Sequence, residues 1–132
     1  MKKVIIVLVL IIVIGMGGGG TWLYLSNKKP APLVEFSYDP GEYFVTDISG
    51  SNRYLKTDII IHGLDDKIVE KLTAENYKIR DLVICILRTK TAAQIQSPTI
   101  QQDLKTQIVK ELNTEFSTET FDTLYFNEFV IQ

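Results

Sequence analysis

The chain has 132 residues, of which 45% are hydrophobic, and this length suits one domain of ordinary size. Its net charge is −2, but the part from Leu33 to Gln132 carries ten basic and sixteen acidic residues, a net charge of −6. Nucleic-acid binding needs a positively charged surface, so this composition excludes it, and the same sign disfavours contact with anionic lipid surfaces.

The N-terminal part of the chain predicts a membrane anchor. Residues 4–25 are 22 consecutive positions without a charged side chain. As a helix they would extend roughly 33 Å, enough to cross a hydrocarbon core of about 30 Å. We therefore predict a transmembrane helix from Val4 to Leu25 after a cytoplasmic stub of residues 1–3. Lys2 and Lys3 favour a cytoplasmic N-terminus.

A cleaved signal peptide is the alternative interpretation of this segment. Two lysines, an apolar stretch and then small glycines are typical of such peptides, and Gly18 or Gly20 could lie at the cleavage site. Both interpretations export the rest of the chain across the membrane. The glycines also allow two readings, because Gly15 and Gly19 have the spacing of a helix-packing face, whereas glycine in general loosens a helix end.

A short connector, residues 26–32, follows the predicted anchor. Pro30 and Pro32 favour an extended path, and seven residues at about 3.1 Å each reach only roughly 20 Å. The exported domain, residues 33–132, is therefore expected to stay close to the membrane. Its partners would be other membrane-anchored objects nearby.

The domain is predicted to begin with three strands. Residues 33–38 and 42–48 flank a turn at Asp39-Pro40-Gly41, and residues 54–61 alternate between apolar and polar side chains. In the third strand, Leu55, Thr57, Ile59 and Ile61 share one face, which predicts a strand buried on that side only.

Three helices are predicted next. Asp65 and Asp66 suit a helix start, followed by a short apolar stripe. A second stripe comprises Ile79, Leu82, Val83, Ile86 and Leu87. The third helix is predicted over residues 98–116, with Ser97 as cap and Pro98 as first helical residue. Its apolar positions recur every four residues, at Ile100, Leu104, Ile108, Leu112 and Phe116.

The chain closes with the sequence LYFNEFVIQ, Leu124 to Gln132. Strict alternation puts apolar residues on both faces, with Leu124, Phe126 and Val130 on one face and Tyr125, Phe129 and Ile131 on the other. A strand of this kind favours neighbours on both sides, so we predict that it lies inside the sheet and not at its edge. The predicted fold class is α+β, in the order β-β-β-α-α-α-β.

Little in the exported domain predicts chemistry. Cys85 and His62 are the single cysteine and histidine, and no spacing of ligands predicts a metal or cofactor site. Cys85 is interpreted as a small buried hydrophobic residue and His62 as a polar residue at a strand end. Asp65 and Asp66 are better explained by helix capping than by catalysis. A hydrolase using Cys85 and His62 would need both in one cleft.

Four stretches resemble the bacterial inner-membrane family of flagellar basal body-associated proteins, FliL. They are RYLKTDIII (53–61), KIRDLVICILRTKT (78–91), DLKTQIVKELN (103–113) and LYFNEFVIQ (124–132). The resemblance implies a periplasmic domain similar to the stomatin/prohibitin type that assembles into rings around the stator, the ion-conducting unit that drives the rotor. It also implies a non-enzymatic accessory role in torque generation and motility, without cofactors, on the inner membrane at the basal body.

The resemblance also carries over to single positions. Those that match the family are interpreted as structural, and the residues that contact the stator are not assigned. Because other anchored proteins would share the anchor, the connector and the acidic domain, a scaffold or adaptor of another envelope or secretion complex is the alternative function. The matching positions are Arg80, Asp81, Leu104, Asn113, Phe126, Phe129 and Gln132.

Overall fold

The structure, a computed structural model, describes residues 30–132. The chain divides into two compact units, Met1–Pro32 and Leu33–Gln132, and the second contains all the helices and strands described below. The predicted transmembrane helix lies outside the described residues. No helix within residues 30–132 has the length and apolar character needed to span a membrane.

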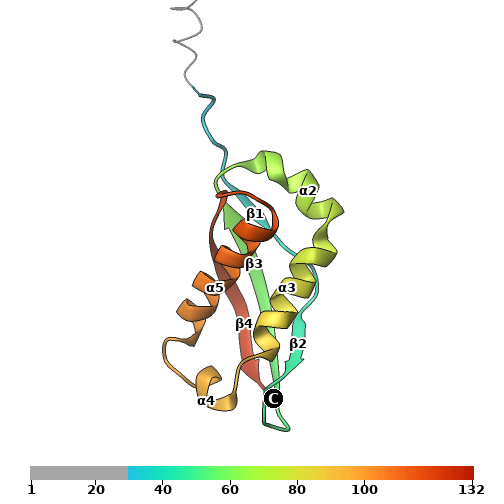
Figure 1. The fold of residues 1–132 in the computed structure, drawn as a ribbon, viewed down its shortest axis with the longest axis vertical. Helices are drawn as coiled ribbons and strands as arrows, with labels where there is room; N and C mark the ends of the chain where they lie inside the picture. Colours follow the sequence, from blue (N-terminus) through green and yellow to red (C-terminus); the bar gives the residue numbers. More distant parts are fainter. Residues whose placement is uncertain (1–29) are drawn as a thin grey trace, which may run out of the picture. The chain divides into compact units, whose positions relative to one another are not determined.

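Three antiparallel ladders join the other strands of the sheet to one central strand, β3 (Tyr54–Gly63). The long strand β4 (Phe121–Ile131) pairs with one edge of β3 over its whole length. The short strands β1 (Phe36–Tyr38) and β2 (Phe44–Asp47) lie end to end on the other edge, where β1 pairs with residues 61–63 and β2 with residues 54–57. The sheet is therefore three strands wide, with β4 along one whole side (Figure 1).

The turn between β1 and β2 bends the chain without making a hairpin. The Gly41 N–H donates to the Asp39 carboxylate at 2.8 Å, and Gly41 has φ of 96°, a conformation that glycine adopts without steric cost. Both strands are shorter than predicted. The alternation of β3 is confirmed, because Leu55, Thr57, Ile59 and Ile61 are each fully buried.

The helices cover one face of the sheet. A 3₁₀ turn, η1 (Asp66–Ile68), leads into α2 (Val69–Ala74), and α3 (Asn76–Arg88) follows directly. As predicted, Asp65 caps this start, its carboxylate accepting from the Lys67 N–H at 3.2 Å. The long helix α5 (Ile100–Glu115) packs on β4, and α3 packs on β2 and against α5.

Two details of the helices differ from the prediction. A short helix, α4 (Ala92–Ile95), was not predicted; it begins with a capping box in which Thr91 and Gln94 bond each other's backbone. The helix α5 begins at Ile100 with Thr99 as cap, so Pro98 precedes the helix, and the Ser97 hydroxyl instead accepts from the Thr99 N–H at 3.4 Å.

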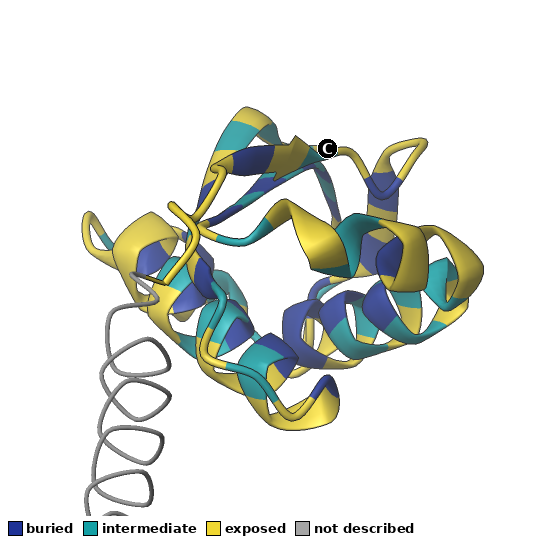
Figure 2. Cartoon of the chain, turned by 90° about the horizontal axis from the view of Figure 1, so that it is seen from above, coloured by how far each residue is buried: buried dark blue, intermediate teal, exposed yellow. Residues whose placement is uncertain are grey.

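The core lies between the helices and the inner face of the sheet. The buried positions of Figure 2 turn inward from both layers, and exposed positions follow the outer surfaces. The apolar stripe of α5 is confirmed, since all its members are at most 7% exposed: Ile100, Leu104, Ile108, Leu112 and Phe116.

The position predicted for the last strand is wrong. Within the described residues β4 pairs with β3 alone, so it is an edge strand. The register shifts between Asp58 and Ile59, where Asn127 is an extra residue on the β4 side. This bulge reverses the alternation beyond it. Phe126, Phe129 and Ile131 therefore all pack on the core with the buried Leu124, and the opposite face carries Tyr125, Glu128 and Val130.

Candidate interaction surface

The outer edge of β4 presents unpaired backbone groups. Tyr54 and Gln132 exchange both backbone hydrogen bonds at 2.8 Å, which fixes the phase of the antiparallel ladder between β3 and β4. By alternation from that pair, the N–H and C=O groups of Phe129 and Ile131 point away from β3. Beyond the bulge, those of Leu124 and Phe126 do the same. No backbone group elsewhere in the described residues bonds to these four positions.

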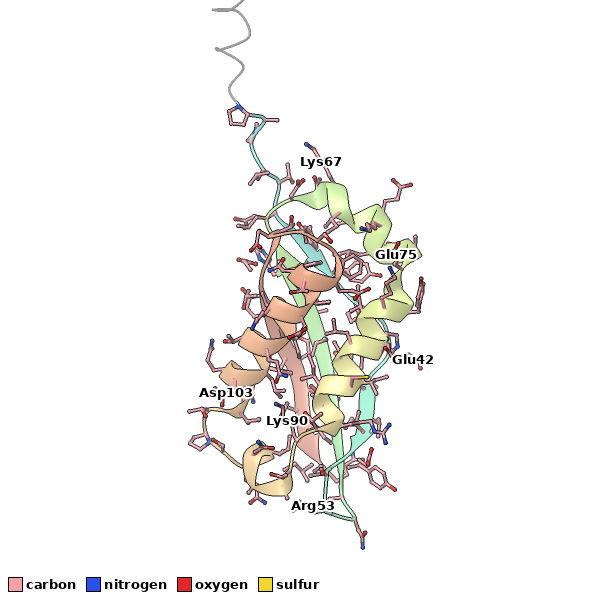
Figure 3. All side chains as sticks on the ribbon, viewed as in Figure 1. Glu42, Arg53, Lys67, Glu75, Lys90 and Asp103 are labelled. Atoms are coloured by element: carbon pink, nitrogen blue, oxygen red, sulfur yellow. The ribbon has the colours of Figure 1, made fainter. Side chains whose placement is uncertain are left out.

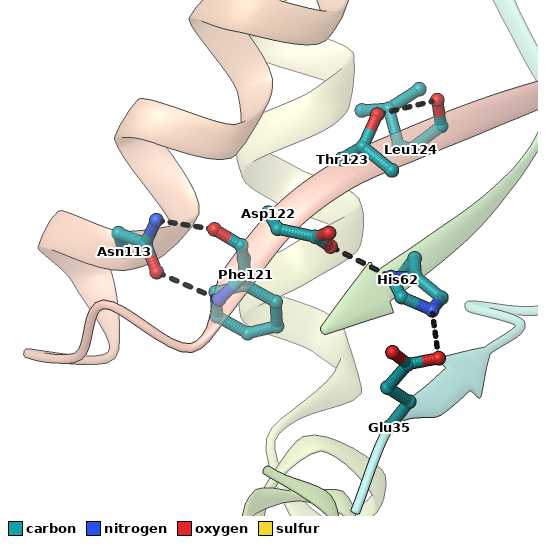
Figure 4. Close-up of polar contacts among 7 residues, drawn as sticks. All are labelled: Glu35, His62, Asn113, Phe121, Asp122, Thr123 and Leu124. Carbon is teal, nitrogen blue, oxygen red and sulfur yellow. Dashed lines mark hydrogen bonds and ion pairs between the residues drawn. The ribbon is translucent and has the colours of Figure 1, made fainter. Parts of the chain in front are cut away.

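The N-terminal end of this edge is closed by Asn113 of α5. Its side-chain amide donates to the Phe121 carbonyl at 2.8 Å, and its amide oxygen accepts from the Phe121 N–H at 3.1 Å (Figure 4). One asparagine thus takes both bonds that a neighbouring strand would make to Phe121. The open edge begins beyond Phe121.

A polar groove runs between α5 and the beginning of β4, with a volume of about 910 Å³. The ammonium of Lys105 lies 5.4 Å from the ring centre of Tyr125, so this flexible side chain reaches the strand near its midpoint. Lysines beside an edge strand limit unspecific pairing. The groove is lined by Gln102, Lys105, Thr106, Val109, Lys110, Asn113, Thr114, Ser117, Thr118, Glu119, Asp122 and Thr123.

No described helix covers the outer face of the sheet, and apolar side chains are exposed there. Val45, Lys56 and Val130 lie side by side across β2, β3 and β4. Val45 is 59% exposed and Val130 is 41% exposed. Between them Lys56 donates to the Glu128 carboxylate at 3.1 Å and lies 3.8 Å from the ring centre of Tyr43. The result is an apolar patch around one ion pair.

The opposite edge of the sheet is closed by α3. Asn76 donates to the Pro40 carbonyl at 3.0 Å, and Arg80 donates to the carbonyls of Pro40 at 3.2 Å and Glu42 at 2.9 Å. The Arg80 guanidinium also stacks 4.6 Å from the ring centre of Phe44. Arg80 therefore fastens a helix to the turn between β1 and β2.

A second polar cluster lies at the end of β3. The His62 Nδ1 is 2.7 Å from the Asp122 carboxylate, and its Nε2 is 3.8 Å from the Glu35 carboxylate (Figure 4). The ring of Tyr125 packs edge-on against that of His62. His62 thus joins Glu35, the residue before β1, to β4 across the outer face of the sheet.

The prediction that Cys85 is buried is wrong. Cys85 is exposed on α3, where it lines shallow surface grooves with Asp81 and Arg88. His62 belongs to the sheet, with Glu35, Asp122 and Tyr125 as its neighbours, so the structure does not bring the cysteine and the histidine together. Within residues 30–132, no group of three or more His, Cys, Asp or Glu side chains could hold a metal ion.

The helical layer carries its own ion pairs. Lys78 lies 2.9 Å from Glu75 and 3.7 Å from Glu115, linking the beginning of α3 to the end of α5; Figure 3 labels Glu75 at that end of the helix. The hydrogen bond from Lys78 lowers the pKa of Glu75, and the same bond raises the pKa of Lys78. At the other end of α3, Lys90 donates to Gln107 at 2.8 Å.

The remaining family-matching positions are distributed through the fold. Leu104 is fully buried in α5, and Asp81 is exposed on α3 without an ion pair among the described residues. Phe126 and Phe129 pack edge to face, with ring centres 5.3 Å apart. Gln132 closes the ladder against Tyr54.

Sequence reasoning missed the residues of the open edge and the outer patch. Lys56 and Glu128 are 72 positions apart, so only the strand register brings them together. The signal that could have identified β4 as an edge strand is the polar pair Asn127-Glu128 inside an aromatic run, which is typical of a bulge.

Comparison with known proteins adds the family context. The model of the family described as flagellar basal body-associated protein FliL matches residues 37–132. The flagellar protein FliL of Aquifex aeolicus (strain VF5) is 27% identical over 107 residues, which is 80% of this chain and 66% of that protein. The chain thus spans slightly less than two thirds of the length of this relative.

Proposed function

Because the chain belongs to the FliL family of flagellar basal body-associated proteins, we propose that it is a non-enzymatic accessory of the flagellar motor. In this proposal, the N-terminal helix from Val4 to Leu25 holds the protein in the inner membrane. The domain of residues 33–132 then lies in the periplasm, associates with copies of itself and supports the stator units that generate torque.

The observation that carries this proposal is the match of the family model over residues 37–132, nearly the whole of the second compact unit. The geometry of the described residues is compatible with a binding role. The polar groups with the shortest contacts, such as Asn113 and Arg80, join one element of the fold to another. The surface features left without a partner are a strand edge and an apolar patch, which are typical of protein contacts.

Self-association would use surfaces that the domain already exposes. The apolar patch around Lys56 and the open edge of β4 adjoin each other at Val130, so one neighbour could cover both. A likeness to the stomatin/prohibitin type of domain would fit such assembly into a ring and is part of the proposal.

A clean deletion of the gene tests the proposed function. We expect flagellar filaments to assemble and rotation under load to fail, measured as the speed of tethered beads of increasing size and as swarming on stiff agar. Expression of the full chain from a second locus should restore torque. A matched control is the same domain behind a cleavable signal peptide, which should be exported and should not restore torque if the anchor is needed.

Two results would contradict the proposal. Normal torque at every load after deletion would remove the motor role. Co-purification of the full chain with an envelope or secretion complex, and not with flagellar components, would favour the alternative of a scaffold or adaptor elsewhere.

A further inference from the structure

We propose that His62 is a pH-dependent switch, which fastens the residue before β1 to the sheet when its ring is doubly protonated and releases that residue when the ring is neutral. Two carboxylates face the two ring nitrogens, one from Asp122 of β4 and one from Glu35 before β1 (Figure 4). The switch belongs to the domain itself and does not depend on the motor role.

The strand register brings these three side chains together. His62 is paired with Ser37 of β1 on one side and with Thr123 of β4 on the other. The ladder between β3 and β4 shifts directly after His62, and Asp122 is the extra residue of β4 at that point. A bulge can re-aim a side chain, and here the Asp122 carboxylate comes within 2.7 Å of the His62 Nδ1. Because β1 is antiparallel to β3, Glu35 enters the sheet at the same end.

The contact with Asp122 fixes the tautomer of the neutral ring. An ionised carboxylate only accepts hydrogen bonds, so the 2.7 Å contact needs a hydrogen on Nδ1. A neutral imidazole carries a single N–H, so its Nε2 then presents a lone pair to the Glu35 carboxylate, 3.8 Å away. The doubly protonated ring instead presents an N–H and a positive charge to both carboxylates. The contact with Glu35 therefore forms only in the protonated state.

The exposure of the two partners suits a reversible contact. Histidine changes its charge between about pH 5 and 8, and His62 is the single histidine of the chain. Its side chain is 18% exposed, so protons from solvent reach a ring that the sheet holds in place. The Glu35 side chain is 74% exposed, so water replaces the ring as its partner when the contact is lost.

The other charged groups near the ring have partners of their own. Lys56 and Asp58, on the same face of β3, are bonded to side chains of β4. From β4 the ring of Tyr125 packs edge-on against the imidazole. From α5 the ammonium of Lys105 lies 5.4 Å from the centre of that tyrosine ring. The two carboxylates are therefore the groups that respond to the charge of the imidazole.

The switch acts where the chain enters the sheet. The Val34 carbonyl accepts from the Asp66 N–H at 3.0 Å, and Phe36 pairs with Gly63. Glu35 lies between these two backbone contacts. At low pH its side chain adds a third point of attachment, and at high pH the backbone contacts act alone. Order in the residues that lead into β1 should therefore increase as the pH falls.

Spin labelling tests this dependence. The full chain in detergent micelles carries Cys85→Ser and one nitroxide label at Val34→Cys, a position that is 55% exposed and adjoins Glu35. The EPR spectrum gives the ratio of ordered to mobile label. This ratio should rise roughly two- to fivefold from about pH 8 to about pH 5.5, the size of effect expected from an exposed ion pair. An unchanged ratio would overturn the proposal.

A second label position and charge variants serve as controls. A label at Tyr77→Cys, 67% exposed on α3, should not respond to pH, and an equal response there would overturn the proposal. Glu35→Gln and His62→Gln should each give the same ratio at both pH values. Glu70→Gln, which removes an exposed carboxylate from α2, should keep the response of the parent. A response that survives Glu35→Gln would contradict the switch, and this exposed substitution tests it even if His62→Gln fails to fold.

Asp122→Asn separates a switch from a purely structural contact. An asparagine amide can donate to Nδ1, so the neutral ring can carry its hydrogen on Nε2 and donate to Glu35. The ratio in Asp122→Asn should therefore be high at both pH values, as in the parent at about pH 5.5. If Asp122 only braces the ring, its loss should give a low ratio at both pH values, and that result would overturn the proposal.

Discussion

Replacing Asn113 by alanine tests how β4 is held at its beginning. The change removes the two hydrogen bonds between the Asn113 side chain and the Phe121 backbone, at 2.8 and 3.1 Å. Phe121 is only 2% exposed. Each hydrogen bond contributes about 0.5–1.5 kcal/mol to the free energy of unfolding. A buried N–H or C=O group that loses its partner and that water does not reach adds a desolvation cost. We therefore expect a loss of about 1–3 kcal/mol in the free energy of unfolding.

The neighbouring Thr114→Ala is the matched control. Its hydroxyl bonds the Lys110 carbonyl within the same helix, at an exposed site, so its loss should stay within about 0.5 kcal/mol. Both variants gain a similar small amount of helix propensity from alanine, about 0.5 kcal/mol, which cancels in the comparison. The difference between them therefore reports on the Phe121 contacts alone.

Urea unfolding of the full chain in detergent micelles, followed by pulsed proteolysis, measures this difference. Hydrogen exchange adds a local readout, because the Phe121 amide should exchange faster in Asn113→Ala than in Thr114→Ala. Asn113→Asp keeps an acceptor for the Phe121 N–H and loses the donor to its carbonyl, so it too should be destabilised. Equal stability of Asn113→Ala and Thr114→Ala would refute the role of Asn113 in closing this edge.

Two further predictions concern the packing of β3 and the pH dependence of the helical layer. Gly63→Ala should destabilise the domain by about 1–3 kcal/mol, because a Cβ atom there would lie 2.5 Å from a ring carbon of Phe36; the added Phe36→Leu should reduce this penalty in a double-mutant cycle of urea unfolding. The pKa of Glu75 is lowered in the folded state, so its bond to Lys78 stabilises the fold above pH 4.5 and is lost as the pH falls below that value. In thermal unfolding, the melting temperature of Glu75→Gln should therefore be lower than that of the parent at pH 7 and equal to it in acid. The control Glu70→Gln should have the melting temperature of the parent at both pH values.

The fold class and most of the core could be predicted from the sequence because they depend on local periodicity. The stripe of α5 and the alternation of β3 each follow from spacing along one segment, and both are confirmed. The same rule, applied to Cys85, would have avoided the error. At about 100° per residue, Cys85 falls outside the stripe formed by Ile79, Val83 and Ile86, and it is exposed.

The candidate surface could not be predicted in the same way, because it depends on register. A single extra residue, Asn127, reverses the alternation of β4, so strict alternation divides its core residues between two faces, although Leu124, Phe126, Phe129 and Ile131 all pack on the core. That interpretation placed β4 inside the sheet. The helix α4 was missed for a different reason, since its four residues are too few to show periodicity, although the Thr91 and Gln94 capping signal was present.

The direction of the strands bears on how anchored copies could assemble. β1 and β4 are both antiparallel to β3, so they run parallel to each other within one copy. In the proposed arrangement, copies held in one bilayer by an N-terminal helix would be related by rotation about the membrane normal and not by inversion across the membrane. A contact between two different edges repeats under such a rotation from copy to copy, and it closes into a ring when the angle divides a full turn. A contact between two β4 edges would instead stop at a dimer. In a shared membrane, a contact between two unlike surfaces is therefore the kind that can continue around many copies.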